Sequence, residues 1–306
     1  MTAGAVPTTR REALTADSAL VFVTAIWGST FVVNRVMLQT TPPLLFLLMR
    51  FGLAAVVLYF LTGSRPKTPG LFRDSAVIGA LLAVGIGCQL AGQLYTTASK
   101  AAFVTGLSVP LTPVMSYVMT RKLPTAANLA GLLLAVAGFT LLSWPTGASG
   151  VNAGDLIILG TAVSYAMLVV CLAEAAGRHD VRWFSFGQIA AGAVSVVLLR
   201  VLLIPVLSRG GTFLAAEARP VPWGRPLLFA VLWMALAATV VTFLLQTWAQ
   251  ARMSAPHAAI VFALEPVFTA LFAAIFLGER LTRRDWAGAA LVLLGILVSE
   301  LPLSRR

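Results

Sequence analysis

The chain repeats a pattern of polar residues inside long apolar segments, and this repeat constrains the fold more than any other feature of the sequence. A shift of 157 positions carries Gln89 and Gln93 onto Gln246 and Gln250. The same shift carries Ala101–Ala102 onto Ala258–Ala259, Gly131 onto Gly288 and Gly138 onto Gly295. Nearer the N-terminus, a shift of 138 carries Asp17 onto Asp155, Trp27–Gly28 onto Tyr165–Ala166 and Arg50 onto Gln188. The polar loop at 208–225 accommodates the difference between the two shifts, so the sequence predicts two related halves.

The composition places both halves in a membrane. The chain is 59% hydrophobic and 11% charged, with a mean hydropathy of +0.91, whereas soluble domains carry about 25% charged residues. A membrane-spanning helix needs roughly 20 apolar residues. Segments of about that length occur at 17–38, 43–62, 75–98, 101–120, 126–144, 154–174, 183–207, 226–251, 256–277 and 284–301. The sequence therefore predicts an all-α integral membrane protein with ten transmembrane helices.

These segments divide into two inverted five-helix repeats. Because five is an odd number, two successive repeats of five spans must cross the membrane in opposite orientations. We expect a tail at 1–16, the first repeat at 17–144, a linker at 145–153, the second repeat at 154–301 and a tail at 302–306.

The basic residues of the loops predict the orientation. The net charge is +11, but the bases lie in short loops and tails, which favours a membrane over nucleic acid as the partner. In the first half, the side of the N-terminus carries Arg10, Arg11, Arg65, Lys67, Arg73, Arg121 and Lys122, and the other side carries Arg35 and Lys100. The second half is nearly even. The positive-inside rule then places both termini in the cytoplasm of a bacterium and the protein in its inner (plasma) membrane.

Glu265 lies inside the ninth apolar segment and is followed by Pro266. An ionised carboxylate in hydrocarbon costs between ~3 and ~15 kcal/mol, so this side chain must face protein, water or a counter-ion, or hold a proton. Pro266 lacks an N–H donor and loosens the preceding turn. Two interpretations stay open: a proton-coupling or substrate-amine site, and a structural carboxylate bound to a neighbouring helix end.

Arg50, about seven residues into the second segment, presents the same choice. It could bind an anionic group of a substrate or pair with a carboxylate. It could also bond to helix carbonyls or extend to the nearer interface, and this structural role is the favoured one.

Polar and aromatic side chains on shared helix faces indicate a central cavity. Residues four apart lie on one helix face, so each pair of glutamines forms a stripe. Such stripes either bond neighbouring helices, at ~0.6 kcal/mol per hydrogen bond, or line a polar cavity, and aromatic residues can equally be packing or interfacial residues. The candidates for the cavity are Trp27, Asn34, Arg50, Gln89, Gln93, Tyr95, Tyr165, Gln188, Gln246, Trp248 and Gln250.

Glycines mark the fifth and tenth segments. Gly131 and Gly138 share one helix face, as do Gly288 and Gly295, because seven residues make two turns. Small residues let helices approach closely. We expect these faces to serve packing, with a homodimer through spans five and ten as the alternative.

No part of the sequence signals an enzyme or a cofactor. Gly106-Leu107-Ser108 has the Gly-x-Ser form of intramembrane serine proteases, which also need a histidine at matching depth. His179 falls in a loop and His257 at the start of the ninth segment. Metal-ligand spacings and phosphate-binding glycine loops are absent from the sequence. We expect no catalytic residue, metal or cofactor.

The chain resembles EamA-type permeases of the drug/metabolite transporter superfamily over residues 17–301. The resemblance rests on Ala25-Ile26-Trp27-Gly28-Ser29-Thr30-Phe31, Pro43 with Arg50-Phe51, Tyr95-Thr96-Thr97-Ala98-Ser99-Lys100-Ala101-Ala102, Leu264-Glu265-Pro266-Val267, Leu277-Gly278-Glu279-Arg280-Leu281 and Trp286-Ala287-Gly288. It implies ten helices, cytoplasmic termini, a central cavity, peripheral spans five and ten, and export of amino acids, other metabolites or drugs. The first half lacks the Gly-Glu-Arg-Leu motif, so we expect Glu279 only to offset Arg280, Arg283 and Arg284.

Together these features predict a secondary transporter that works by alternating access. No ATP-binding motif is present, so an ion gradient or the substrate's own gradient would drive it. Its partners would be a small-molecule substrate, the lipid bilayer and protons, with Glu265 as the proton carrier. The rival is a non-transporting receptor or scaffold, which polar stripes at matched depth and the lack of an attached soluble domain disfavour. An intramembrane serine protease is a distant third.

Overall fold

The computed structural model describes residues 10–64, 68–121, 125–143, 152–203, 211–252, 261–262 and 264–299. Throughout this part of the chain, all regular secondary structure is helical. The first half contains α1 (Arg10–Met37), α2 (Pro43–Leu61), α3 (Leu71–Gln93), α4 (Ala98–Gly106), α5 (Ser108–Thr120) and α6 (Ala126–Ser143). The second half contains α7 (Ala153–Ala175), η2 (Ala176–Arg178), α8 (Val181–Leu203), α9 (Thr212–Glu217), α10 (Arg225–Leu232), η4 (Trp233–Val241), α11 (Thr242–Gln250), α13 (Glu265–Leu277) and α14 (Arg283–Ser299).

Seven of these helical stretches are long and apolar enough to cross a membrane. They are Leu14–Met37, Pro43–Leu61, Leu71–Gln93, Ala98–Met119, Ala153–Arg178, Val181–Leu202 and Arg225–Gln250. Two further apolar helices, Ala126–Gly138 and Glu265–Leu277, are shorter. The expected helical fold is therefore confirmed. Ten spans stay a prediction, because part of the ninth segment lies outside the described residues and α14 begins with charged residues.

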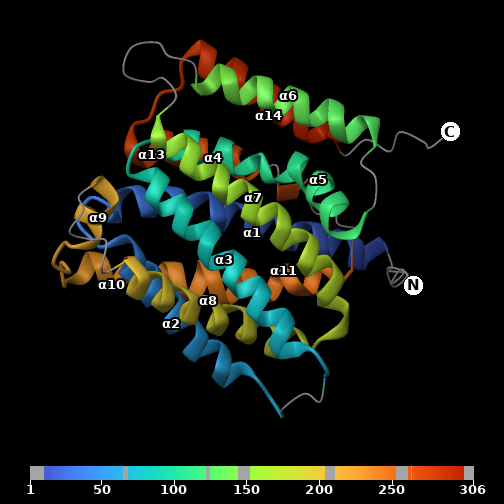
Figure 1. Ribbon diagram of the computed structural model, residues 1–306, viewed down its shortest axis with the longest axis vertical. Coiled ribbons are helices and arrows are strands. Elements are labelled where there is room, and N and C mark those ends of the chain that lie inside the picture. Colours follow the sequence, from blue (N-terminus) through green and yellow to red (C-terminus); the bar gives the residue numbers. More distant parts are fainter. Residues whose placement is uncertain are drawn as a thin grey trace.

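The helices form a bundle with one pair at its edge. In Figure 1, α6 and α14 run side by side along one edge, and α1, α3 and α7 lie in the middle. Helix α3 packs against α7 and α8, α2 packs against α8, and α1 packs against α13 and α11. The bundle therefore interleaves helices of the two halves.

The pair α6–α14 is held by glycine faces. A Cβ atom on Gly138 would lie 2.6 Å from the Gly288 carbonyl oxygen, and one on Gly295 would lie 2.5 Å from the Ala135 nitrogen. Any larger residue would overlap the backbone of the other helix, so only glycine permits this approach. The packing interpretation is thus confirmed. A homodimer through these two helices would have to use their outer faces.

The polar loop at 208–225 contains a buried carboxylate. Glu217, at the end of α9, is 3% exposed. Its Oε2 atom accepts a hydrogen bond from the Leu44 backbone N–H at 2.8 Å, and its Oε1 atom pairs with Arg200 Nε at 2.7 Å. Glu217 therefore satisfies one of the free N–H groups at the start of α2, which has no side-chain cap of its own.

Two helical segments are interrupted at equivalent positions of the two halves. Helix α4 ends at Gly106 and α5 starts at Ser108. Helix α13 starts at Glu265, which is 157 positions after Ser108, and Pro266 occupies its first turn. Proline is tolerated there because the first N–H groups of a helix have no internal partner. A third irregularity is the π-helix η4. Discontinuous helices and π-helical turns are typical of binding sites in membrane transporters and other proteins.

Candidate functional site

A cavity of about 100 Å³ lies where α1, α2, α3, α5, α7, α11 and α13 meet. Six of the residues singled out in the sequence line it: Trp27, Arg50, Gln89, Tyr165, Gln246 and Glu265. These residues come from six helices and both halves of the chain. The structure therefore brings together the two charged candidates, one glutamine of each pair and two aromatic residues.

Equivalent positions of the two halves line the same cavity. Its lining includes both Trp27 and Tyr165, which the shift of 138 relates. It also includes pairs related by the shift of 157, namely Gln89 with Gln246, Ser108 with Glu265 and Ile86 with Phe243. The two helix interruptions thus both open onto the same site.

Arg50 is held by the π-helix. Its side chain donates from Nε to Thr239 Oγ1 at 2.8 Å and from Nη2 to the Ala238 carbonyl oxygen at 3.0 Å. Arg50 is 5% exposed. A π-helix displaces carbonyl groups from their usual i→i+4 bonds, and Thr239 itself donates back to the Met234 carbonyl oxygen. Arg50 therefore bonds to a helix carbonyl, as one interpretation of the sequence holds, and also lines the cavity.

Glu265 occupies the first position of α13. The N-terminus of a helix carries a partial positive charge, which favours a carboxylate there. Its carboxylate forms no hydrogen bond or ion pair with any residue that the structure describes. Thr269 donates to the carbonyl oxygens of Glu265 and Gly28, which joins α13 to α1 beside the cavity.

Aromatic and amide groups complete the wall. The Trp27 ring packs against Phe243 and Phe262, with centroids 6.2 Å and 5.7 Å apart. Gln89 and Gln246 are each 4% exposed, and their amides form no hydrogen bond with a described residue. The wall thus offers an apolar surface and two amides whose donors and acceptors are available to a ligand or to water.

The size of the cavity limits its occupant. Pockets for drug-sized ligands typically measure about 300–1,000 Å³, and a cavity of about 150 Å³ holds benzene. At about 100 Å³, this cavity is smaller than either.

Comparison with known proteins decides the family. The model of the EamA-like transporter family matches residues 14–144 and 152–301. The chain belongs to the EamA-like transporter family. An uncharacterized transporter of Archaeoglobus fulgidus is 32% identical over 94% of this chain and 86% of its own length. A Salmonella typhimurium protein named a probable amino-acid metabolite efflux pump is 26% identical over 90% of this chain and 92% of its own.

A solved crystal structure has the same fold. It aligns with a TM-score of 0.64 and 17% identity, over 95% of this chain and 97% of its own. At this identity the likeness concerns the fold alone. The expected resemblance to EamA-type permeases is thus confirmed, and the protein is a membrane transporter by family.

The other six candidates of this EamA-like transporter lie outside the cavity lining: Asn34, Gln93, Tyr95, Gln188, Trp248 and Gln250. Gln93 donates to the Phe31 carbonyl oxygen at 3.2 Å. This bond joins α3 to α1, which is the interhelical role that the sequence analysis offered for the glutamines. Trp248 lies under the Arg252 guanidinium at 4.4 Å. Asn34 and Gln188 are fully buried, and their amides have no partner among the described residues.

Several lining residues were not singled out in the sequence, including Thr30, Thr112, Phe243 and Phe262. Hydroxyl and phenyl groups are common in transmembrane helices, so these residue types alone do not indicate a cavity. Ser108 could have been found, because it is the repeat mate of Glu265.

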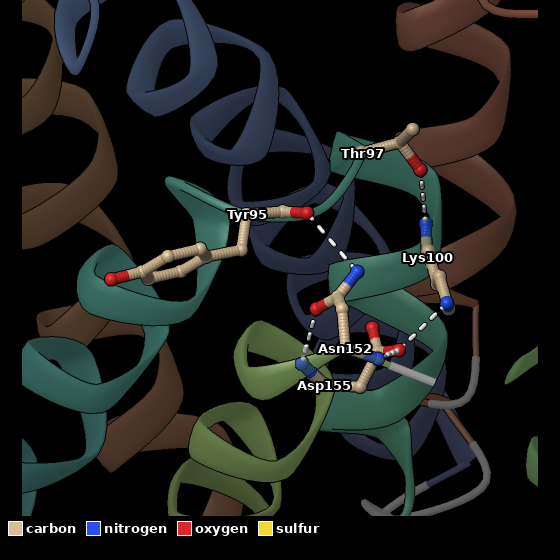
Figure 2. Close-up of polar contacts among 5 residues, drawn as sticks. All are labelled: Tyr95, Thr97, Lys100, Asn152 and Asp155. Carbon is tan, nitrogen blue, oxygen red and sulfur yellow. Dashed lines mark hydrogen bonds and ion pairs between the residues drawn. The ribbon is translucent and has the colours of Figure 1, made fainter. Parts of the chain in front are cut away.

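A polar cluster joins the two halves at the end of the bundle where α3 meets α4. Lys100 Nζ lies 2.7 Å from Asp155 Oδ2, and Asn152 Nδ2 donates to the Tyr95 carbonyl oxygen at 3.1 Å. Asn152 and Asp155 also form the capping box of α7. Figure 2 shows Asn152 and Lys100 converging on Asp155, with the Tyr95 ring pointing away. We call Tyr95, Lys100, Asn152 and Asp155 the α4–α7 cluster.

Glu279 caps a helix of the other half, a role that the sequence did not suggest. It accepts hydrogen bonds from the backbone N–H groups of Ala98 and Ser99 and from the Ser99 hydroxyl, at 2.9, 3.1 and 2.7 Å. Among the described residues it forms no ion pair with Arg280, Arg283 or Arg284. The expectation that Glu279 offsets the charge of these arginines stays a prediction. Its carboxylate caps α4, because the N–H groups that start a helix need acceptors.

Proposed function

We propose that this EamA-like transporter is a secondary transporter that exports small organic molecules by alternating access, in exchange for protons carried by Glu265. The observation that carries the proposal is the shared cavity. Both halves contribute equivalent residues to it, and it contains a carboxylate without a described partner. A site between two repeats, formed at helix interruptions, is the arrangement used by secondary transporters.

The contacts between helices support two inverted repeats of five spans. Suppose that α1 corresponds to α7, α2 to α8, α3 to the stretch α10–η4–α11, α5 to α13 and α6 to α14. The contact of α3 with α7 then has a counterpart in the contact of α11 with α1. The contact of α1 with α13 likewise corresponds to that of α7 with α5, and the contact of α3 with α8 to that of η4 with α2. The pairs α2–α8 and α6–α14 each join equivalent helices. A pseudo-twofold axis produces such an exchange, and an odd number of spans per repeat would place this axis in the membrane plane.

The α4–α7 cluster supports alternating access. It joins the start of α4 in the first half to the start of α7 in the second, and Glu279 adds a second link between the halves at the same helix start. Rocking one repeat against the other would break these bonds at one end of the cavity and open the site there. The size of the cavity favours small metabolites over drugs. The relative named as an efflux pump supports export.

The function is tested with the cavity glutamines. We expect Gln89→Leu and Gln246→Leu together to lower transport at least tenfold, because each removes hydrogen bonds to the substrate worth about 1 kcal/mol. The measurement compares metabolites released by cells expressing the wild type, the double variant or no protein. The exposed Gln39→Leu serves as the matched control. A released-metabolite profile identical in all four strains would sink the transport proposal.

The orientation is a separate prediction. We expect both termini in the cytoplasm of the inner membrane and the segment at 208–225 outside, from the bases of the first half. In a background without Cys88 and Cys171, an impermeant thiol reagent on intact cells should label a cysteine at Thr212 and spare one at Arg10. Labelling of Arg10→Cys with protection of Thr212→Cys would reverse the topology.

A further inference from the structure

A groove lies on the outer face of the bundle between α3 and α8. It measures about 470 Å³, and its walls include Leu71, Phe72, Ala76, Trp183, Ala190 and Val194. Phe72 is 87% exposed and Val194 is 60% exposed, so the groove opens toward the surroundings of the bundle. None of its lining residues lines the central cavity. The groove is therefore a separate site.

The groove is hollow because its two helices approach closely through small residues. A Cβ atom on Gly79 would lie 2.5 Å from the Gln188 carbonyl oxygen, so no side chain fits between α3 and α8 there. The lining residues Gly187 and Ala191 are also small. Their side chains are too short to fill the space on the outer side of the helix contact.

The length of the groove matches one leaflet of a bilayer. Its lining on α8 runs from Trp183 to Ser195, which at 1.5 Å per residue spans roughly 18 Å. One leaflet contributes roughly 15 Å to the hydrocarbon core. The Trp183 indole N–H donates to the Ser64 carbonyl oxygen at 3.0 Å, and tryptophan is enriched where a membrane meets water. The groove thus extends from headgroup level at Trp183 toward the middle of the membrane.

Two arginines at the headgroup end of the groove are without an ionic partner. Arg73 on α3 and Arg182 on α8 are exposed and belong to no ion pair among the described residues. The carboxylates at this end already have partners. Asp74 pairs with Arg178, and Asp180 accepts hydrogen bonds from two N–H groups at the start of α8. The charge available to a ligand at this end is therefore positive.

The start of α3 offers further hydrogen-bond donors. Its N-cap is Gly70, without a side-chain acceptor, and the first N–H groups of a helix have no acceptor within it. Such helix starts bind phosphate groups. About one turn further along, Ser75 lines the groove and is 3% exposed. Its hydroxyl has no hydrogen-bond partner among the described residues. A buried polar group without a partner is costly, so this hydroxyl indicates an acceptor that a ligand supplies.

We propose that the groove binds an anionic phospholipid of the surrounding leaflet. The phosphate lies at the start of α3 near Arg73 and Arg182, an ester carbonyl accepts a hydrogen bond from Ser75, and one acyl chain fills the hollow. The order of phosphate, ester and chain in the lipid is the order in which the groove presents positive charge, hydroxyl and apolar wall. A void against hydrocarbon loses van der Waals contacts unless a chain fills it. Basic pockets between membrane helices commonly bind anionic headgroups.

This site goes beyond the proposed function, because it concerns a lipid that stays bound and not the transported molecule. Helix α3 belongs to the first half of the chain and α8 to the second, and the two pack against each other. A lipid in the groove contacts both halves at once. It therefore stabilises the contact between them.

Native mass spectrometry of the full-length protein tests the site. The purified protein is mixed with equal amounts of phosphatidylglycerol and phosphatidylcholine that carry identical acyl chains, and the lipids retained on the protein are counted. We expect the first retained lipid to be phosphatidylglycerol at least ten times as often as phosphatidylcholine. Phosphatidylglycerol should also raise the unfolding temperature in neutral detergent more than phosphatidylcholine does.

Charge variants test the headgroup end. Arg73→Gln combined with Arg182→Gln should lower the preference for phosphatidylglycerol at least fivefold, because two positive charges near the phosphate are lost. The matched control combines Arg225→Gln and Arg283→Gln, which replace exposed arginines at the starts of α10 and α14. This control should keep the preference of the wild type.

Filling the hollow tests the position of the acyl chain. Ala190→Phe should lower the retention of both lipids at least fivefold, whereas Ala274→Phe at an exposed position of α13 should leave it unchanged. If Ala190→Phe does not fold, Val194→Trp replaces it at an exposed position of the groove. Ser75→Ala should weaken the retention of phosphatidylglycerol and leave its ether-linked form unaffected, since only the ester has a carbonyl acceptor.

Equal retention of the two lipids by the wild type would overturn the proposal, and so would an unchanged preference in the double arginine variant. Retention that the groove-filling variants do not alter would place the lipid elsewhere. A pair of protein copies without bound lipid, separated by those same variants, would show that this face is an interface between copies and would also overturn the proposal.

Discussion

Replacing Glu265 by Gln is expected to abolish proton-driven accumulation of substrate while the protein still reaches the membrane. Gln keeps the shape and hydrogen bonding of the side chain but cannot bind and release a proton. The carboxylate lines the cavity, has no described partner and starts α13. Desolvation favours its neutral form, and water or an approaching cation favours the ionised form. Alternating access would move it between these environments, which couples the proton to the substrate.

The measurement is substrate flux in proteoliposomes with an imposed pH gradient. Glu265→Gln should still exchange substrate down its own gradient, with weaker binding, and Glu265→Asp should retain part of the driven uptake. Glu174→Gln, an exposed carboxylate on α7, should behave as the wild type. If flux through Glu265→Gln stayed fully responsive to the pH gradient, Glu265 would be a structural residue beside Pro266.

Removing the charge of Lys100 is expected to be among the most destabilising single changes in the bundle. Asp155 is 0% exposed, and Lys100 pairs with it at 2.7 Å with 13% of its own side chain exposed. Lys100→Met leaves the carboxylate buried and uncompensated, which costs about 3–5 kcal/mol. One carboxylate oxygen, Oδ1, already has no partner among the described residues, so no second donor at this oxygen offsets the loss of Lys100.

The unfolding temperature in detergent measures this effect. Adding Asp155→Asn to Lys100→Met should recover most of the loss, because the amide oxygen can still accept the capping bond from Asn152 without a charge. The matched control is Arg178→Met. Arg178 is 61% exposed, and its partner Asp74, which is 20% exposed, keeps the contact with His179 Nε2 at 2.8 Å, so at most about 1 kcal/mol should be lost. Equal unfolding temperatures of Lys100→Met and the wild type would show that the Lys100–Asp155 pair contributes nothing to the stability of the bundle.

Sequence alone determined the kind of protein. Long apolar segments can satisfy their backbone groups in a membrane only as helices, so helix positions follow from length and hydropathy. The shared offsets of Trp27 with Tyr165 and of Gln89 with Gln246 also predicted that matched positions lie together, and the cavity contains both pairs. Glu265 stood out because a carboxylate is costly in an apolar segment.

The tertiary structure alone decided which candidates face the cavity. Gln89 and Gln93 share a helix face, yet only Gln89 lines the site, while Gln93 bonds to the backbone of α1. In an apolar helix the sequence has little contrast between faces that meet lipid, neighbouring helices or a cavity, so periodicity cannot choose among them. The partners of Arg50 lie almost 190 positions away in the sequence, on a π-helix that no local sequence pattern predicts. Its role depends on how two distant helices pack, and that is a property of the assembled bundle.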